Sequence, residues 1–288
     1  MEKGGSMQFV MFSKMLHEYD VAQLGDAIKG VGFDGVDLTV RPEGHIEPQD
    51  AKRDLPEAVR ILRDKGLTVP MLTTGITAAS SPNAEDIIAT AAQLDIRLLK
   101  LGYWQYQGFG AGKKQLDSAR KDLDSLAPIA AKHGVTLCLH THSGDFLTAT
   151  PAQMLILLAN RDPGTFGAYA DLGHLTVEGG LSGWKMGLDL LSDRIKIVAA
   201  KGMGWWYVPG FADERGEWRR VMLPLEDSMV RWNEAFGYLK QIGFDGPVSL
   251  HSEYSGNHSW RPMPSIADIL AQTRTDLAYI SGVVEQLG

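Results

Sequence analysis

The chain has 288 residues, of which 44% are hydrophobic and 22% are charged, so its composition is typical of a globular protein and excludes a mainly disordered one. Its formal net charge of −7 argues against nucleic acid as the main partner, because such binding depends on Lys and Arg. No stretch approaches the roughly 20 apolar residues needed to cross a bilayer, so no membrane partner is expected. The single cysteine, Cys138, rules out an intramolecular disulfide framework and is expected to be a buried, inert thiol.

Residues 1–7 lack the apolar core of a secretory signal peptide. We interpret them as a disordered or expression-derived tip in front of the folded domain. A soluble cytoplasmic protein is the simplest expectation.

From residue 8 onward, short apolar runs alternate with longer amphipathic segments. The first strand is expected at 8–13, and the segment 21–31 has apolar residues at helical spacing. The other expected strands are 35–39, 67–73, 97–102, 135–140, 166–172, 194–200 and 246–252. The other expected helices are 55–65, 83–94, 116–133, 151–160, 184–191, 229–241 and 265–287. Repeated strand–helix units imply parallel strands joined by right-handed crossovers.

Glycines follow several of the expected helices, among them Gly66, Gly134 and Gly243, where a left-handed residue commonly ends a helix. Eight strand–helix units predict a single-domain (β/α)8 TIM barrel over residues 8–288. A doubly wound sheet is the alternative. Such a sheet usually carries a phosphate-binding motif after its first strand, and neither GxGxxG nor GxxxxGK[ST] occurs there.

Polar residues gather where the expected strands end, which is where parallel barrels carry their chemistry. Five of the eight histidines lie at such ends. The candidate residues in chain order are Asp37, Arg41, His45, Tyr103, Trp104, His140, His142, Asp171, His174, Lys201, His251 and Glu253. Taken singly, each has a simpler interpretation as a loop residue or, for Asp171, as a helix N-cap. Their clustering nevertheless predicts a polar site at one end of the barrel.

The segment 202–227 interrupts the alternation and is rich in aromatic residues. It is expected to be a long loop over the mouth of the barrel, since loops beyond about 12–15 residues are commonly functional. Flat aromatic faces would suit the C–H groups of a sugar. Alternatively, the rings pin the loop to the barrel. The aromatic residues are Trp205, Trp206, Tyr207, Phe211 and Trp218.

Two motifs carry a family resemblance. One is Ala170-Asp171-Leu172-Gly173-His174 followed by Glu178-Gly179-Gly180, and the other is the segment 243–250 leading into the last strand. On these motifs the chain resembles the xylose-isomerase-like barrel superfamily over residues 8–287. The resemblance implies an isomerase or epimerase acting on a sugar, sugar phosphate or polyol, and a homodimer or tetramer.

The resemblance also implies a metal site, but with altered ligands. Members of the epimerase type hold a divalent metal with Glu, Asp, His and Glu from strands five to eight. Asp171 matches the strand-six ligand, whereas His140 and His251 stand at the two Glu positions and Ala199 stands at the His position. The set implied for this chain is His140, Asp171 and His251, with His142 or Glu253 available as a fourth ligand. Such a set suits Zn, Mn, Fe, Co or Ni.

The chemistry expected from the resemblance is proton abstraction next to a carbonyl through an enediolate. Glu253 and His142 are the candidates for proton transfer, and Lys201 is the candidate acid or electrophile. The candidates for substrate binding are Arg41, His45, Trp104, His174 and Trp205. A lyase or dehydratase on a keto-sugar, a non-catalytic sugar-binding barrel and an endonuclease-IV-like enzyme stay open as alternatives.

Overall fold

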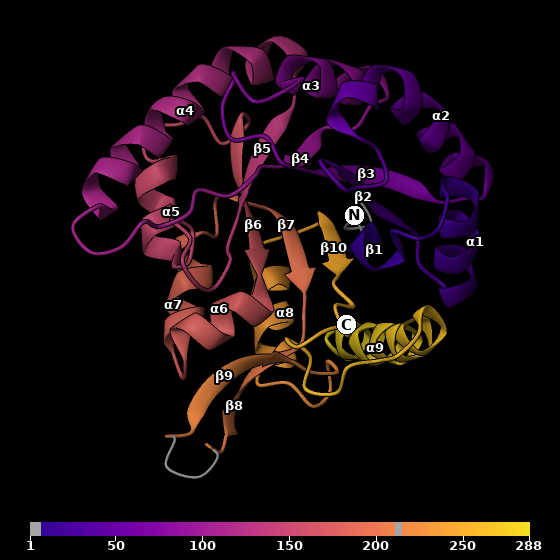
Figure 1. Ribbon diagram of the computed structural model, residues 1–288, viewed down its shortest axis with the longest axis vertical. Coiled ribbons are helices and arrows are strands. Elements are labelled where there is room, and N and C mark those ends of the chain that lie inside the picture. Colours follow the sequence, from indigo (N-terminus) through magenta and orange to yellow (C-terminus); the bar gives the residue numbers. More distant parts are fainter. Residues whose placement is uncertain (1–6, 211–214) are drawn as a thin grey trace.

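The computed structural model describes residues 7–210 and 215–288. Within this part of the chain, eight parallel strands close into a barrel in the order β1, β10, β7, β6, β5, β4, β3, β2 (Figure 1). The barrel strands are β1 (Gln8–Phe12), β2 (Gly35–Val40), β3 (Thr68–Thr74), β4 (Leu98–Lys100), β5 (Thr136–His140), β6 (Phe166–Asp171), β7 (Ile195–Ala200) and β10 (Pro247–Leu250). The predicted (β/α)8 TIM barrel is confirmed.

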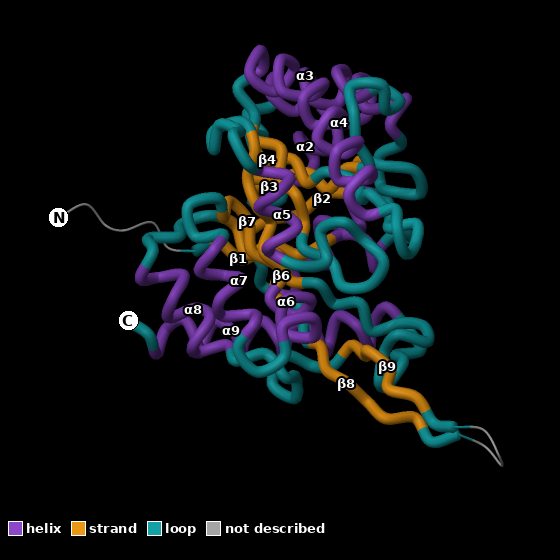
Figure 2. Tube along the Cα trace, turned by 90° about the vertical axis from the view of Figure 1, so that its left-hand side faces the viewer, coloured by secondary structure: helices purple, strands orange, loops and turns teal. Residues whose placement is uncertain are grey.

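Helices surround the barrel, as Figures 1 and 2 show. They are α1 (Val21–Val31), α2 (Ala51–Asp64), α3 (Ala84–Gln93), α4 (Gly112–His133), α5 (Pro151–Leu158), α6 (Leu172–Gly179), α7 (Gly183–Leu190), α8 (Trp232–Gln241) and α9 (Ile266–Gln286), with short 3-10 turns at Ser13–Leu16 and Pro48–Asp50. The predicted glycine caps are confirmed: Gly66, Gly134 and Gly243 have φ values of 73°, 62° and 72°. None of the helices that the structure describes is long and apolar enough to span a membrane.

The crossover after β6 differs from the prediction. One helix was expected at 184–191, but two helices, α6 and α7, occupy this crossover. The Asp171 carboxylate accepts a hydrogen bond from the His174 N–H at 2.9 Å and so caps the N-terminus of α6. The apolar run of β6 continues into α6 without a break in the sequence, which is why periodicity did not separate them.

Part of the predicted loop 202–227 is an antiparallel hairpin, formed by β8 (Met203–Val208) and β9 (Glu217–Met222). Residues 211–214, including Phe211, lie outside the described residues, as do residues 1–6 of the predicted N-terminal tip. The base of the hairpin is anchored because Met203 and Met222 pack against Val177 of α6. Its outer part projects from the barrel (Figure 2).

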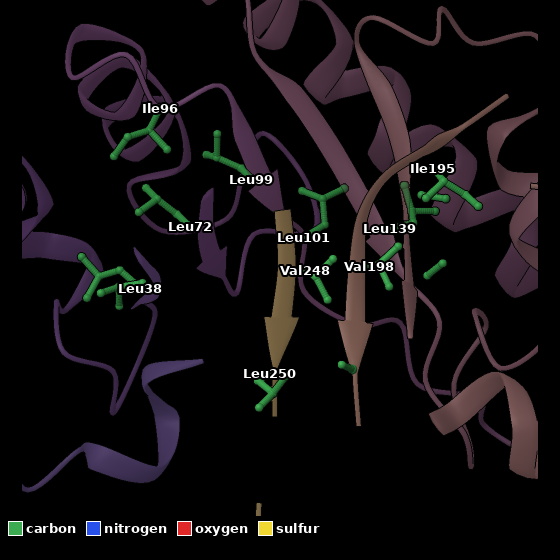
Figure 3. Close-up of a cluster of buried hydrophobic side chains, with 14 of the residues drawn as sticks. Leu38, Leu72, Ile96, Leu99, Leu101, Leu139, Ile195, Val198, Val248 and Leu250 are labelled. Carbon is green, nitrogen blue, oxygen red and sulfur yellow. The ribbon is translucent and has the colours of Figure 1, made fainter. Parts of the chain in front are cut away.

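The main hydrophobic core fills the space between the strands and the surrounding helices. Figure 3 shows part of it, with buried side chains contributed by several strands, such as Leu38, Leu99 and Val198. A smaller cluster that includes Met71, Cys138 and Tyr169 is separate from this core. The expected burial of Cys138 is confirmed, and burial raises the pKa of its thiol to about 12.

Candidate active site

A cavity of about 90 Å³ opens among the residues that end or follow the barrel strands. It is lined by Phe12, Lys14, Arg41, Thr73, Lys100, Tyr103, His140, His142, Tyr169, Lys201, His251 and Glu253. A larger hollow of about 310 Å³ lies on the outer helices around Trp184 and Tyr238, but its lining is mainly apolar. The mouth cavity is therefore the candidate active site, because it gathers titratable groups from many strands.

Glu253 is the only carboxylate among the residues lining this cavity, and two ammonium groups hold it. Its Oε1 lies 2.8 Å from Lys201 Nζ, and its Oε2 lies 2.6 Å from Lys14 Nζ. Burial alone would raise the pKa of Glu253, but Lys201, His251 and Lys14 outweigh it and hold that pKa well below its ordinary value. The carboxylate is thus ionised at neutral pH.

A chain of hydrogen bonds connects Lys201 with the hairpin. The Lys201 ammonium donates to His174 Nε2 at 3.2 Å, and His174 Nδ1 donates to the Ser143 hydroxyl at 2.6 Å. Arg220 of β9 donates to the same hydroxyl and, at 2.7 Å, to the Ser143 carbonyl oxygen. Burial, followed by the nearby Lys201 charge, keeps the pKa of His174 well below 6.5, so its ring is neutral. The base of the hairpin therefore fixes the orientation of the site lysine.

His142 lines the cavity, and one of its ring nitrogens is unprotonated. Its Nδ1 lies 3.0 Å from the Ser143 carbonyl oxygen, which can only accept, so Nδ1 carries the hydrogen and Nε2 carries the lone pair. Its ring lies 4.0 Å, centroid to centroid, from the ring of His174. Burial, and then the charges of His140 and Lys201, lower the pKa of His142 to about 3.

The predicted metal ligands His140, Asp171 and His251 come together beside the cavity. His140 Nε2 lies 3.3 Å from Asp171 Oδ2, and both atoms are buried without a hydrogen-bond partner, as is His251 Nδ1. Within residues 7–210 and 215–288, however, no three His, Cys, Asp or Glu side chains are arranged to hold a metal ion. Ala199 adds no ligand. In this arrangement the three residues do not form a metal site, although each keeps a buried donor atom without a hydrogen-bond partner.

A second carboxylate, Asp37 of β2, lies fully buried below the cavity. It accepts hydrogen bonds from Thr73 at 2.7 Å, from Ser249 at 2.8 Å and from the Tyr169 hydroxyl at 3.3 Å. The Tyr169 hydroxyl also lies 2.8 Å from His251 Nε2. Burial raises the pKa of Asp37 to about 6, although these hydrogen bonds oppose the rise. The network fixes the floor of the site and the orientation of the His251 ring.

Lys100, the last residue of β4, is a site residue that the sequence analysis did not single out. It is 2% exposed, and its Nζ lies 3.6 Å from the centroid of the Tyr103 ring. Burial, and then the charge of Arg41, hold its pKa well below 10.5. The Tyr103 hydroxyl in turn shares a 2.7 Å hydrogen bond with His140 Nδ1.

The structure brings most of the predicted site residues together. Those that line the cavity are Arg41, Tyr103, His140, His142, Lys201, His251 and Glu253, while Asp171 and His174 lie directly behind. Three predicted substrate-binding residues are engaged elsewhere. His45 bonds the Leu16 carbonyl and the Thr39 hydroxyl, the Trp104 indole donates to Asp122, and the Trp205 indole donates to the Val177 carbonyl.

The cavity residues missed by the sequence analysis are Phe12, Lys14, Thr73, Lys100 and Tyr169. Lys14 carried a usable signal, because it directly follows the predicted strand 8–13, whereas Lys100 lies inside the predicted strand 97–102. Tyr169 carried none, because it lies within an apolar strand like any core residue.

Comparison with known proteins agrees with this architecture. The model of the xylose isomerase-like TIM barrel family matches residues 26–278. The chain belongs to this family. No curated protein matches it by sequence. Family membership confirms the resemblance carried by the two motifs.

Solved structures of the family superpose on most of the chain. D-psicose 3-epimerase from Clostridium cellulolyticum, solved with D-tagatose, has a TM-score of 0.70 at 15% identity, covering 96% of this chain and 99% of that one. A probable 3-DHS dehydratase from Bacillus anthracis gives 0.70 at 17% identity, with 94% and 99% covered. A magnesium complex of a family member from Mycobacterium smegmatis gives 0.70 at 16% identity, with 100% and 99% covered. At these identities the likeness shows the shared fold.

Proposed function

We propose that this protein is a sugar isomerase or epimerase that moves a proton next to a carbonyl group through an enediolate. The observation that carries the proposal is the ionised Glu253 carboxylate held beside the Lys201 ammonium in a cavity at the barrel mouth, at 2.8 Å. A base and a cationic electrophile side by side are what enolisation requires. The sugar epimerases among the structural neighbours support the same reaction class.

In the proposed reaction, Glu253 removes the proton from the carbon next to the carbonyl. The electron pair of the broken C–H bond forms the C=C bond of the enediolate, and the carbonyl oxygen takes up the negative charge. The Lys201 ammonium stabilises that oxygen. While it pairs with the carboxylate, Lys201 lowers the basicity of Glu253, so a shift of the ammonium towards the substrate oxygen would restore it.

The second proton transfer decides between isomerisation and epimerisation. We propose His142 as the second group, because its Nε2 carries a lone pair and its ring lines the cavity. Return of the proton to the neighbouring carbon gives isomerisation, and return to the other face of the same carbon gives epimerisation. To act as the acid, the Nε2 lone pair of His142 first takes up a proton from solvent, and its conjugate acid, with a pKa of about 3, then gives that proton to the carbon, while Glu253 later releases the proton it removed to solvent.

The divalent metal expected from the family, Zn, Mn, Fe, Co or Ni, stays a prediction. The magnesium-bound neighbour supports it, whereas the arrangement of His140, Asp171 and His251 does not. Elemental analysis of the purified protein tests it, with His140→Ala and His251→Ala as comparisons. About one metal ion per chain, lost in both variants, would support the predicted ligands. A metal-free wild-type protein would contradict them.

A lyase or dehydratase acting on a keto-sugar is the second candidate. The same enediolate can expel a neighbouring hydroxyl as water, and one structural neighbour is a probable dehydratase. The two reactions separate by product, because elimination creates an unsaturated compound that absorbs in the ultraviolet. A non-catalytic barrel would bind sugar without either outcome.

The function is tested by proton exchange in deuterium oxide, followed by NMR. The wild-type protein is incubated with a panel of keto-sugars that includes D-psicose and D-tagatose, their phosphates and their acids. We expect deuterium to enter next to the carbonyl, and Glu253→Gln to slow this exchange by about 100-fold or more. Glu57→Gln, on the exposed face of α2, is the matched control and should exchange normally. Exchange by Glu253→Gln at the wild-type rate would refute the assigned base, and binding without exchange would favour the non-catalytic barrel.

A further inference from the structure

The charges that line the mouth cavity do not balance. Four cationic side chains face a single carboxylate, Glu253. Lys14 and Lys201 both pair with that carboxylate, at 2.6 and 2.8 Å. Arg41 and Lys100 have no carboxylate within 4 Å among the residues that the structure describes. Two cations of the cavity are thus left without an anionic partner.

Of the two, Lys100 has the greater free-energy cost of staying unpaired, because it is only 2% exposed. A buried ammonium group costs free energy unless an anion or several acceptors compensate it. Its ammonium group lies over the face of the Tyr103 ring. The buried carboxylate of Asp37 favours the charged form of Lys100, but its own hydrogen bonds go to three hydroxyl groups.

The unpaired cations lie on one side of the barrel wall. Arg41 follows β2 and Lys100 ends β4, and β3 lies between these two strands in the barrel. The proposed base Glu253 and the electrophile Lys201 lie across the mouth, since they follow the adjacent strands β10 and β7, whereas His142 follows β5, next to β4. A substrate in the cavity would therefore meet a cationic end and a reactive end.

We propose that the substrate is anionic, and that Arg41 and Lys100 bind its carboxylate or phosphate group while the opposite side carries out the chemistry. This inference rests on the proposed function and narrows its substrate class to sugar acids or sugar phosphates. A bidentate guanidinium and a point-charge ammonium together suit either anion. Binding of the anion supplies the partner that Lys100 lacks in the free protein.

The test is anion binding by isothermal titration calorimetry, which does not depend on turnover. Inorganic phosphate and malonate are titrated separately into wild-type protein, Arg41→Gln, Lys100→Met and a control, Lys113→Met. Lys113 is exposed on α4 and lines none of the mouth cavity. We expect saturable binding of at least one anion, weakened about tenfold or more in both site variants and unchanged in the control. The tighter of the two anions then identifies a phosphate or a carboxylate substrate.

Two results would overturn the inference: no saturable binding of either anion to the wild-type protein, or equal affinity in wild type, Arg41→Gln and Lys100→Met. Thermal unfolding of each variant shows that a loss of binding is not a loss of fold. Anion binding without proton exchange on any sugar would leave this inference standing and refute the proposed function. Proton exchange on neutral sugars without anion binding would refute this inference and leave the proposed function standing.

Discussion

Replacing Lys100 by methionine should make the protein more stable while removing an anion-binding group. The side chain is 2% exposed and has no carboxylate within ion-pair distance among the described residues. Methionine fills a similar space without the charge and packs well against aromatic rings. Replacing buried charged groups by apolar residues of similar volume is often stabilising, by about 1–4 kcal/mol.

The loss of the contact with Tyr103 limits how much Lys100→Met raises the free energy of unfolding. The Lys100 ammonium lies 3.6 Å from the ring centroid, and a desolvated cation–π contact is worth about 2 kcal/mol. A methionine sulfur recovers roughly 0.3–1.5 kcal/mol against the same ring. We therefore expect the lower part of the range, a gain of about 1–2 kcal/mol in the free energy of unfolding. At about 2–4 °C per kcal/mol, Tm should rise by several degrees.

The gain should depend on pH in a defined direction. Burial holds the pKa of Lys100 well below 10.5 in the folded protein, so as the pH rises the folded chain loses this proton before the unfolded chain does. Between the folded pKa and 10.5, the stability of the wild-type protein therefore rises with pH. The advantage of Lys100→Met should shrink as the pH approaches 10.5.

Thermal unfolding of wild type, Lys100→Met and the exposed control Lys113→Met, at pH 7 and pH 9.5, measures both effects. The control should stay within about 0.5 kcal/mol of the wild type at both pH values. A Lys100→Met protein that melts below the wild type at pH 7, with the control unchanged, would show that the lysine is compensated in the free protein. That result would refute the argument for an unpaired cation.

Three further predictions concern the reactive side of the site. Lys201→Met removes a charge that lowers the pKa of Glu253, so the acidic limb of the kcat/KM profile should move to higher pH; an unmoved limb would contradict the pairing. The folded protein keeps His142 neutral down to about pH 3, whereas the unfolded chain protonates it near pH 6.5. The free energy of unfolding should therefore fall, by at most roughly 5 kcal/mol, as the pH drops from 6.5 towards 3. Urea unfolding of His142→Gln should show a weaker pH dependence in this range. Arg220→Gln breaks the bonds to Ser143, and hydrogen exchange at the base of the β8–β9 hairpin should accelerate, whereas protection equal to wild type would show that Arg220 does not anchor it.

Much of the fold could be predicted from the sequence because the signals are local. Each barrel strand is a short apolar run followed by a helix with one apolar face, and glycines such as Gly134 end the preceding helix in the left-handed region. The hairpin was missed for the opposite reason. Trp205, Trp206 and Tyr207 of β8 are consecutive aromatic residues, so the sequence shows no alternation of apolar and polar residues that would indicate a strand. In the structure all three are exposed.

The position of the site could also be predicted, because the barrel brings the ends of all its strands to one mouth. The partners of each side chain could not be predicted, since they depend on which strands are neighbours. Lys201 and Glu253 are 52 residues apart along the chain, yet β7 and β10 are adjacent and bring their charges to 2.8 Å. Lys100 escaped notice because the strand was predicted to run on to residue 102, and only the structure shows that β4 ends at Lys100 and that the closed barrel buries its side chain.

Asp171 shows why a family motif does not by itself define the chemistry. One of its oxygens caps α6 through the His174 N–H, a structural role that any chain with this turn can use. The other oxygen has no hydrogen-bond partner and lies 3.3 Å from His140, where the family places a glutamate ligand. The motif thus has a structural role at the start of α6. The positive charge next to Glu253 is supplied by Lys201 and not by this motif. If anion binding at Arg41 and Lys100 is observed, the pocket is organised around fixed cations at both ends of its substrate.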